Sequence, residues 1–312
     1  MKLINPLCLA PLAGVTTLPV RELFARLGVA LTHTEMISCA GLIRNNEKTF
    51  DMLRTSGNEA ELIVQLFAND LNVLISGAEV VMRRCEKFSG FGVNMACPMP
   101  KITRNGSGSA LLKKPELAFA MTRELKRFNL PVWVKIRKFD NDNETLKFIA
   151  GLAEARADNI CIHGRTPAQR YEGLADKNIV RLAAKEFPGL ISASGDVKTL
   201  SDIHEYLSFG CVNVMLARGI IANPFLCDEF FGVTRSDESK LEELFSLAER
   251  TREISGEHKA LVILKRFAGS MLRYSHGSAE KRNLAMMAAS LDEITKILMD
   301  NKSCDDKKPD KD

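Results

Sequence analysis

The stretch from Pro131 to Gly164, PVWVKIRKFDNDNETLKFIAGLAEARADNICIHG, contains the pattern that decides the fold. It opens with an apolar run, VWVKI at residue 132, and closes with a second one, NICIH at residue 159. Between them, ETLKFIAGLAEA from Glu144 has apolar residues at helical spacing. Short runs that are apolar almost throughout are typical of parallel strands covered on both faces. The stretch therefore predicts a strand–helix–strand unit of a parallel sheet.

The same unit recurs along the chain up to about residue 216. Six further strand-like runs are LCLAP at 7, LTHT at 31, LIVQLF at 62, GVNM at 92, LISAS at 190 and VNVML at 212. Amphipathic stretches lie between them, such as LPVRELFARLG from Leu18 and ELAFAMTRELKRF from Glu116. A doubly wound sheet would need a nucleotide-type glycine turn, which GSGS at Gly106 does not supply. Eight strand–helix units predict an α/β fold, the TIM (β/α)8 barrel.

The alternation of strands and helices stops near Phe231. From Glu238 to about Leu298 the pattern is helical throughout, which predicts a small C-terminal α-helical domain. The last residues, NKSCDDKKPDKD, are too charged and too poor in apolar groups to fold alone. We expect a barrel over residues 1–232, a helical domain over 233–300 and a disordered charged tail over 301–312.

Composition narrows the class of protein. A chain of 312 residues with 46% hydrophobic content can bury a large core, and a net charge of +4 permits a polyanionic partner. The eight cysteines lack zinc-site spacing and suggest a reducing cytoplasm. Pro6 and Pro11 interrupt the apolar start, so it reads as a strand and turn, and no apolar run is long enough to span a membrane. We expect a cytoplasmic monomer without a metal.

Polar residues interrupt the apolar pattern at the ends of the expected strands, where a barrel gathers its chemistry. In chain order they are Pro11, Glu35, Gln65, Asn94 with Cys97, Lys135 with Arg137, His163, the Ser194–Gly195–Asp196 turn, and Ala217 with Arg218 and Gly219. A single late-strand polar group is often only a cap or a loop contact. A ring of them across all eight strands predicts an active-site mouth.

The last two strands of the expected barrel indicate a phosphate site. Glycine-containing turns follow both, and their backbone N–H groups, with Arg218, suit a phosphate. Gln65, Lys135 and His163 would face a ligand lying across the mouth. A flat, polar-edged cofactor with one phosphate fits this arrangement, and FMN is the candidate.

Five motifs occur in an order that resembles a known family. They are APLAGVT from Ala10, VNMACPMPKITRNGSGSALL from Val93, HGRTPAQRYEGLAD from His163, SGDV from Ser194 and LARGIIANPF from Leu216. The chain resembles the tRNA-dihydrouridine synthases over nearly its whole length. The resemblance implies an FMN-dependent enzyme that reduces the C5–C6 double bond of specific uridines in tRNA, with NADPH or NADH as reductant.

The resemblance also implies roles for single positions. FMN contacts fall on Pro11, Leu12, Ala13, Gln65, Lys135, His163, Ser194, Gly195, Asp196, Ala217 and Arg218. The segment near the substrate RNA falls on Arg165, Thr166, Gln169 and Tyr171. We also expect substrate or RNA contacts at Asn94, at Lys101 and Arg104 in the loop that follows Cys97, and at Arg137. Five positions depart from the family's usual residue: Leu12 for methionine, Ala96 for glycine, Ser194 for asparagine, Ala217 for glycine and Lys177 for tryptophan.

Cys97 matches the family's proton donor. Hydride addition at C6 of uracil leaves negative charge toward C5, which then needs a proton. A thiol with an ordinary pKa of about 8.5 is mostly protonated at neutral pH, so Cys97 can supply that proton. The alternative is a small buried hydrophobe, which is how we interpret Cys8, Cys161 and Cys211 within apolar runs.

The helical domain carries a basic segment. Between Gly256 and Arg282 stand six basic residues, Lys259, Lys265, Arg266, Arg273, Lys281 and Arg282, against two acidic ones. We predict a face that binds tRNA phosphates, in which Lys265, Arg266 and Arg273 take part. The alternative is an ordinary solvated helical surface.

Two other functions fit parts of the pattern. An FMN barrel reductase of free pyrimidines would not need the basic helical domain. A flavin-bearing RNA-binding protein without reductase activity is the second alternative, and the RNA could then be ribosomal.

Overall fold

The computed structural model describes residues 3–272 and 278–300. The chain divides into two compact units, the first ending at Ala217 and the second beginning at Arg218. The expected tail, residues 301–312, lies outside the described residues, as does Arg273.

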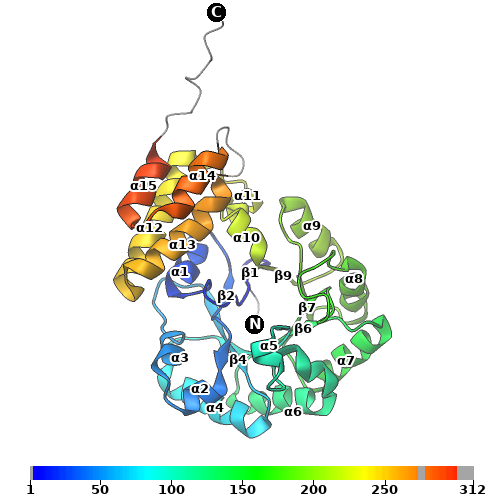
Figure 1. Ribbon diagram of the computed structural model, residues 1–312. Coiled ribbons are helices and arrows are strands. Elements are labelled where there is room, and N and C mark those ends of the chain that lie inside the picture. The colour runs from blue at the N-terminus through cyan, green and yellow to red at the C-terminus, as the bar shows by residue number, and fades with distance from the viewer. Residues whose placement is uncertain (1–2, 273–277, 301–312) are drawn as a thin grey trace, which may run out of the picture. The chain divides into compact units, whose positions relative to one another are not determined.

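The first unit is a closed barrel of eight parallel strands (Figure 1). They are β1 (Leu7–Leu9), β2 (Leu31–His33), β4 (Glu61–Phe67), β5 (Gly90–Met95), β6 (Val132–Arg137), β7 (Asn159–His163), β8 (Ile191–Ser194) and β9 (Asn213–Leu216). Neighbouring strands of the barrel pair in chain order, and β1 pairs with β9 to close the ring. The short β3 (Ile37–Ser38) follows β2 in the chain and pairs with β4, but β2 also pairs directly with β4. The predicted TIM barrel is confirmed, with all eight predicted strands.

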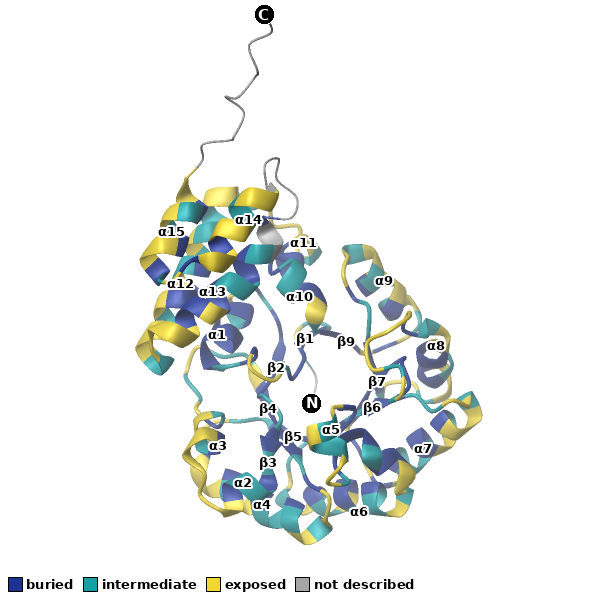
Figure 2. Ribbon diagram, in the orientation of Figure 1, coloured by how far each residue is buried: buried dark blue, intermediate teal, exposed yellow. Residues whose placement is uncertain are grey.

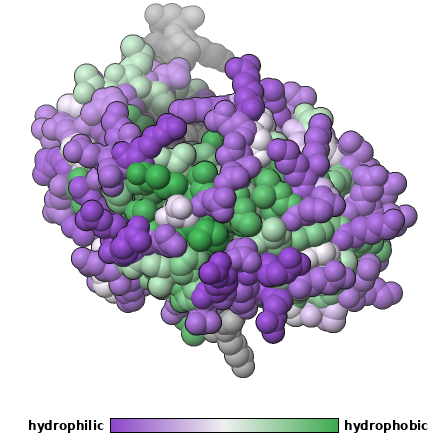
Figure 3. Space-filling model, turned by 90° about the horizontal axis from the view of Figure 1, so that it is seen from below, coloured by the Kyte–Doolittle hydropathy of each residue, from purple (hydrophilic) through white to green (hydrophobic). Residues whose placement is uncertain are grey.

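Helices surround the ring of strands and bury one side against it (Figure 2). They are α1 (Leu18–Arg26), α2 (Cys39–Ile43), α3 (Glu47–Asp51), α4 (Leu71–Arg84), α5 (Pro100–Thr103), α6 (Pro115–Leu125), α7 (Asp142–Glu154), α8 (Lys177–Glu186) and α9 (Leu200–Ser208). The three helices predicted from Leu18, Glu116 and Glu144 are present as α1, α6 and α7. Figure 3 shows the face on the side of α4 and α6, where hydrophobic residues gather in the middle and hydrophilic ones frame them.

Inside the barrel, two buried clusters lie one above the other along the strands. Cys8, Leu31, Ile63 and Trp133 form the first cluster, and Ala10, Cys161 and Met215 form the second. Cys8 and Ala10 are two residues apart on β1, so their side chains lie on the same face of the strand. Apolar side chains therefore pack the barrel interior at these two levels.

The second unit is helical. It contains α10 (Arg218–Ala222), α11 (Leu226–Phe230), α12 (Asp237–Ser255), α13 (Glu257–Met271), α14 (Ser278–Met287) and α15 (Leu291–Met299). Helix α13 packs against α12, α14 and α15. No strand occurs among the described residues after Leu216, as the helical pattern predicted. The unit begins before the predicted boundary at residue 232, and the roles assigned to the two parts stay predictions.

None of the helices within the described residues is both long enough and apolar enough to cross a lipid bilayer.

Candidate active site

The register of the sheet brings five of the predicted site residues side by side. Asn94 on β5 lies opposite Lys135 on β6. Two residues further along β6, Arg137 lies opposite His163 on β7, and His163 lies opposite Ser194 on β8. These are the carboxyl ends of parallel strands, so the residues share one end of the barrel.

The interior faces of the strands change from apolar to polar toward this end. Lys135 stands two residues after the core residue Trp133, and Gln65 stands two after Ile63. His163 likewise follows the core residue Cys161. A separation of two keeps a side chain on the same face of a strand. These three polar groups therefore project from the barrel interior at its mouth.

Lys135 places a positive charge inside the barrel. Burial lowers the pKa of its ammonium, and the charge of Arg137 lowers it further. Within the described part of the chain, the Lys135 ammonium makes no hydrogen bond or ion pair. The residue is nevertheless only partly buried. It therefore lies deep in the mouth with its charge available to a ligand.

Gln65 offers a second unsatisfied group. Its side chain is only 2% exposed, and its Oε1 atom has no hydrogen-bond partner in the described structure. An orphaned buried amide oxygen costs free energy unless a ligand or water satisfies it. Leu12 and Ala217 pack against the second core cluster, that of Ala10, Cys161 and Met215, and add apolar surface at the mouth. Unpaired polar groups beside apolar surface suit a flat ring with polar edges.

The loop after β5 holds Cys97 in a fixed position. The Oδ1 atom of Asn94 accepts hydrogen bonds from the backbone N–H groups of Ala96 and Cys97, at 3.0 and 2.9 Å. The φ angle of Ala96 is not positive, so the loop does not require glycine there. The departure at Ala96 therefore imposes no backbone strain, and Cys97 beside it is only 8% exposed.

Burial raises the pKa of the Cys97 thiol, so this thiol is protonated at neutral pH. A hydrogen bond with the Met99 backbone and the positive charges of Arg137 and Lys135 act in the opposite direction. The same charges favour the thiolate that remains after a proton leaves. Cys97 is thus suited to donate a proton.

Arg137 ties the Cys97 loop to the loop after β7. Its guanidinium is buried and donates to the carbonyl oxygen of Ala96 at 2.8 Å. It also donates to the carbonyl oxygens of Thr166 and Arg170, at 3.0 and 2.7 Å. The ring of Tyr171 lies 5.5 Å from the guanidinium carbon. Arg137 therefore fixes the relative position of the two loops.

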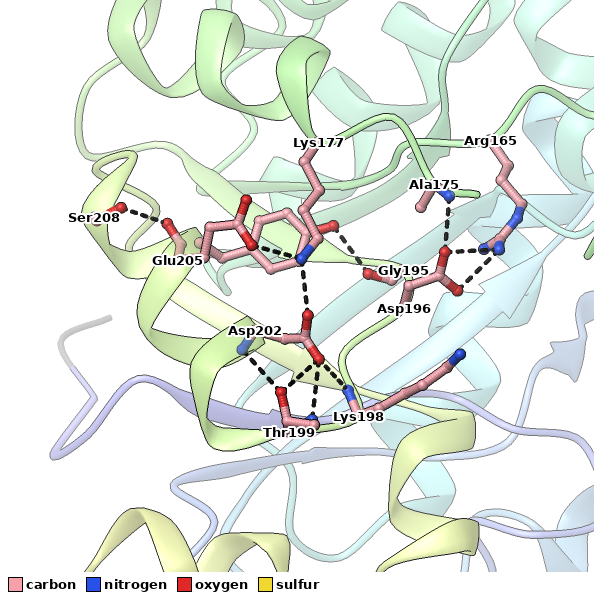
Figure 4. A network of polar contacts seen from close by, with 11 residues as sticks. Arg165, Ala175, Lys177, Gly195, Asp196, Lys198, Thr199, Asp202, Glu205 and Ser208 are labelled. Carbon is pink, nitrogen blue, oxygen red and sulfur yellow. Dashed lines mark hydrogen bonds and ion pairs between the residues drawn. The ribbon is translucent and has the colours of Figure 1, made fainter. Parts of the chain in front are cut away.

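Arg165 links the loop after β7 to the turn after β8 (Figure 4). Its guanidinium is buried and forms an ion pair with Asp196, at 2.7 and 2.9 Å to the two carboxylate oxygens. It also donates to the carbonyl oxygens of Glu172 and Gly173. Arg165 and the Ala175 N–H hold the pKa of the Asp196 carboxyl below its ordinary value, although burial opposes them.

The turn after β8 packs directly on His163. Gly195 has a φ of +113°, and a Cβ atom built there would lie 2.5 Å from Cδ2 of His163. No residue other than glycine fits this approach. Asp196, the next residue, also has a positive φ of 50°. The turn and the histidine thus form one continuous surface.

The turn after β1 is held by Glu35, which the sequence placed at the mouth without assigning it a role. The carboxylate of Glu35 accepts a hydrogen bond from the backbone N–H of Gly14. Gly14 has a positive φ of 67° and ends the turn that begins at Pro11. Ala13 is exposed at this turn. The position of Glu35 after a strand was the only sequence signal for this contact.

The predicted RNA contacts divide into buried and exposed groups. Lys101 lies on α5, Arg104 follows it, and both are exposed. Thr166 and Gln169 hydrogen-bond to each other within their turn, whereas Tyr171 is 48% exposed. Arg218, Lys265 and Arg266 belong to the second unit.

The described residues contain no group of three or more His, Cys, Asp or Glu side chains that could hold a metal ion.

The barrel, with polar side chains at the carboxyl ends of its strands, defines the class of TIM-barrel proteins whose candidate active site lies at that end. The crystal structure of TcOYE with pHBA superposes with a TM-score of 0.55 at 10% sequence identity, over 74% of this chain and 89% of that one. At that identity the likeness shows the shared barrel fold.

The model of the dihydrouridine synthase family matches residues 8–304, and the chain belongs to this family. A probable tRNA-dihydrouridine synthase of Rhizobium leguminosarum is 32% identical over 72% of this chain and 71% of that protein. Another, of Aquifex aeolicus, is 29% identical over 94% of this chain and 95% of that protein. The resemblance stated from the motifs is confirmed.

The raised pKa of Cys97 predicts how its reactivity changes with pH. Because the thiolate is the nucleophile, alkylation by iodoacetamide should be slow at pH 7 and accelerate only above the ordinary thiol pKa of about 8.5. Mass spectrometry of the Cys97 peptide measures the rate at each pH. The Cys211 peptide is the control, since burial raises the pKa of that thiol to about 12. A midpoint for Cys97 below pH 8 would contradict the assignment of a protonated thiol.

Proposed function

We propose that this protein reduces specific uridines of tRNA to 5,6-dihydrouridine, with FMN as cofactor and NADPH or NADH as reductant. Family membership supports the reaction class. The observation that carries the proposal is the position of the buried Cys97 thiol, whose backbone Asn94 fixes at the barrel mouth, close to the charges of Lys135 and Arg137.

The side chains at the mouth fit FMN by their chemistry. The orphaned Oε1 of Gln65 needs a donor, and an imide N–H of a flavin ring is one. The unpaired ammonium of Lys135 suits the ring edge that gains negative charge on reduction. Backbone N–H groups of the Gly195–Asp196 turn suit the phosphate. Arg218, at the start of α10, stays a predicted phosphate contact.

When bound, the flavin would accept a hydride from the nicotinamide and deliver one to C6 of the uracil. Cys97 would then donate its proton to C5, so that one hydride and one proton saturate the C5–C6 bond. Lys135 and Arg137 would stabilise the thiolate that remains until solvent returns the proton. The amide nitrogen of Asn94 makes no hydrogen bond within the described residues and remains for the substrate base.

The base must leave the tRNA stack to reach this mouth, which costs a few kcal/mol. We propose that Lys101, Arg104 and Tyr171, exposed on the two loops that Arg137 joins, receive the extracted nucleotide. Lys265 and Arg266, on α13 of the second unit, would bind tRNA phosphates.

Replacing the proton donor tests the reaction directly. Cys97→Ala should still bind FMN and be reduced by NADPH, but should form dihydrouridine about 10²- to 10⁴-fold more slowly, because no acid protonates C5. Mass spectrometry of nucleosides from treated tRNA measures the product. Cys211→Ala, which changes a buried thiol outside the mouth, is the matched control and should retain activity.

Full activity of Cys97→Ala would falsify the proton-donor role. Turnover of free uracil or orotate without RNA would instead favour a reductase of free pyrimidines. Flavin reduction without any dihydrouridine in tRNA or ribosomal RNA would favour an RNA-binding flavoprotein.

Arg137→Lys should separate the two halves of the reaction. A lysine keeps the charge but cannot bridge three carbonyl oxygens, so the Cys97 loop should shift relative to the loop after β7. We expect reduction of the flavin by NADPH to be unchanged and its reoxidation by tRNA to slow about 10²-fold. Stopped-flow absorbance measures both rates. Arg181→Lys, at an exposed position of α8, is the control. Equal slowing of flavin reduction and flavin reoxidation in Arg137→Lys would contradict the role of Arg137 in positioning the Cys97 loop.

The basic face of α13 is tested by salt dependence. The double variant Lys265→Gln/Arg266→Gln should weaken tRNA binding and lower the slope of log K against log salt by about 1 for each phosphate that is no longer bound. Filter binding at several salt concentrations measures the slope. A control double variant, Arg83→Gln/Lys87→Gln, removes the same charge from exposed positions in and after α4. An equal slope in all three proteins would reject this face as an RNA contact.

A further inference from the structure

A tyrosine outside the predicted site anchors the turn after β8. Tyr206 lies on α9 with 0% exposure, and its hydroxyl donates to the carbonyl oxygen of Gly195 at 2.9 Å. Burial raises the pKa of this hydroxyl, and the negative charge of Asp196 adds to the effect. Tyr206 therefore remains a neutral hydrogen-bond donor across the physiological pH range.

This hydrogen bond sets the direction of a backbone N–H. The peptide bond between Gly195 and Asp196 is trans and planar, so its C=O and N–H groups point in opposite directions. With the Gly195 carbonyl held by Tyr206, the Asp196 N–H points away from α9. The orientation of one donor in the phosphate turn thus depends on a side chain of the following helix.

The turn needs such an anchor because its backbone is unusual. Gly195 and Asp196 both have positive φ angles, a conformation that is uncommon for residues other than glycine, although Asp adopts it more readily than most. The ion pair with Arg165 and the hydrogen bond from the Ala175 N–H hold the Asp196 carboxylate (Figure 4). Tyr206 holds the peptide itself.

Lys177 in turn holds Tyr206. The Lys177 ammonium lies 5.3 Å from the centre of the tyrosine ring, within the range of a cation–π contact. It also forms ion pairs with Asp202 at 2.8 Å and Glu205 at 2.7 Å, one turn apart on α9 (Figure 4). Lys177 is the first residue of α8. It therefore fastens α9, and with it the ring, to the neighbouring helix.

We infer that Tyr206, held by Lys177, is a positioning residue that aims the Asp196 N–H at the phosphate of the cofactor. The inference rests on the proposed function, in which the Gly195–Asp196 turn binds that phosphate. Neither residue touches the flavin ring in this assignment. Their effect must therefore depend on the phosphate.

Comparing FMN with riboflavin, which lacks the phosphate, isolates this effect. Dissociation constants for both flavins are measured with the full-length apoprotein by quenching of flavin fluorescence. Tyr206→Phe removes only the hydroxyl and should weaken FMN binding about 3- to 10-fold, the value of one hydrogen bond, while riboflavin binding stays unchanged. Lys177→Met should act in the same direction, by about 2- to 3-fold.

Ser208→Ala is the matched control. It also removes a hydroxyl of α9 that donates to a backbone carbonyl, that of Glu205, and it does not contact the turn. It should leave both affinities unchanged. Thermal unfolding of each apoprotein accompanies the binding data.

The outcomes separate the inference from the proposed function. A loss confined to FMN in Tyr206→Phe supports the positioning role. An equal loss for both flavins, or no loss, overturns it while leaving the cofactor assignment in place. If the unaltered protein binds riboflavin as tightly as FMN, the turn is not a phosphate site, and both the cofactor assignment at this turn and the inference fail.

Discussion

The positive charge of Lys135 inside the barrel is the constraint on which the rest of the site depends. Burying an ammonium group without a partner is costly, and its lowered pKa reflects that cost. Trp133 lies two residues before it and fills the interior below, so the charge can face only the mouth. Arg137 is also buried, but backbone carbonyls satisfy its guanidinium. Of the two charges on β6, that of Arg137 is therefore satisfied by protein groups, whereas the Lys135 ammonium makes no hydrogen bond or ion pair within the described residues.

The loops around this charge are held from within the barrel. Loops that carry function are commonly mobile, because few contacts fix their backbone. Here two buried arginines hold the loop after β7 by its carbonyl groups, Arg137 at Thr166 and Arg170, and Arg165 at Glu172 and Gly173. Arg137 extends to the Cys97 loop and Arg165 to the Asp196 turn. The Cys97 loop, the loop after β7 and the Asp196 turn are therefore linked to one another by buried side chains.

The sequence predicted the barrel because its strands are apolar on both faces and its helices on one, and these are local properties. It also predicted which residues gather at the mouth, because strand ends meet at one end of any such barrel. It did not predict β3, whose two residues are too short to show a pattern. The hydrogen-bond partners of Arg165 and Tyr206 could not be predicted from the sequence either, because the contacts of long side chains depend on how distant segments pack together. The RNA-binding roles predicted for Arg137 and Arg165 stay predictions, and the hydrogen bonds of both guanidinium groups go to protein groups.

The contacts of Ala96 and Lys177 explain how the structure accommodates two of the five residues that depart from the family's usual ones. At Ala96 the backbone makes the important contacts, its N–H to Asn94 and its carbonyl to Arg137, and neither depends on the side chain. A Cβ atom there is compatible with the fixed loop because φ is not positive. At Lys177 the side chain itself matters. Where an aromatic residue is usual, this chain has a cation that lies over the ring of Tyr206 and pairs with two carboxylates of α9. Replacing either residue alone would remove the cation–π contact but would leave the ion pairs of Lys177 or the hydrogen bond of Tyr206 to Gly195 in place.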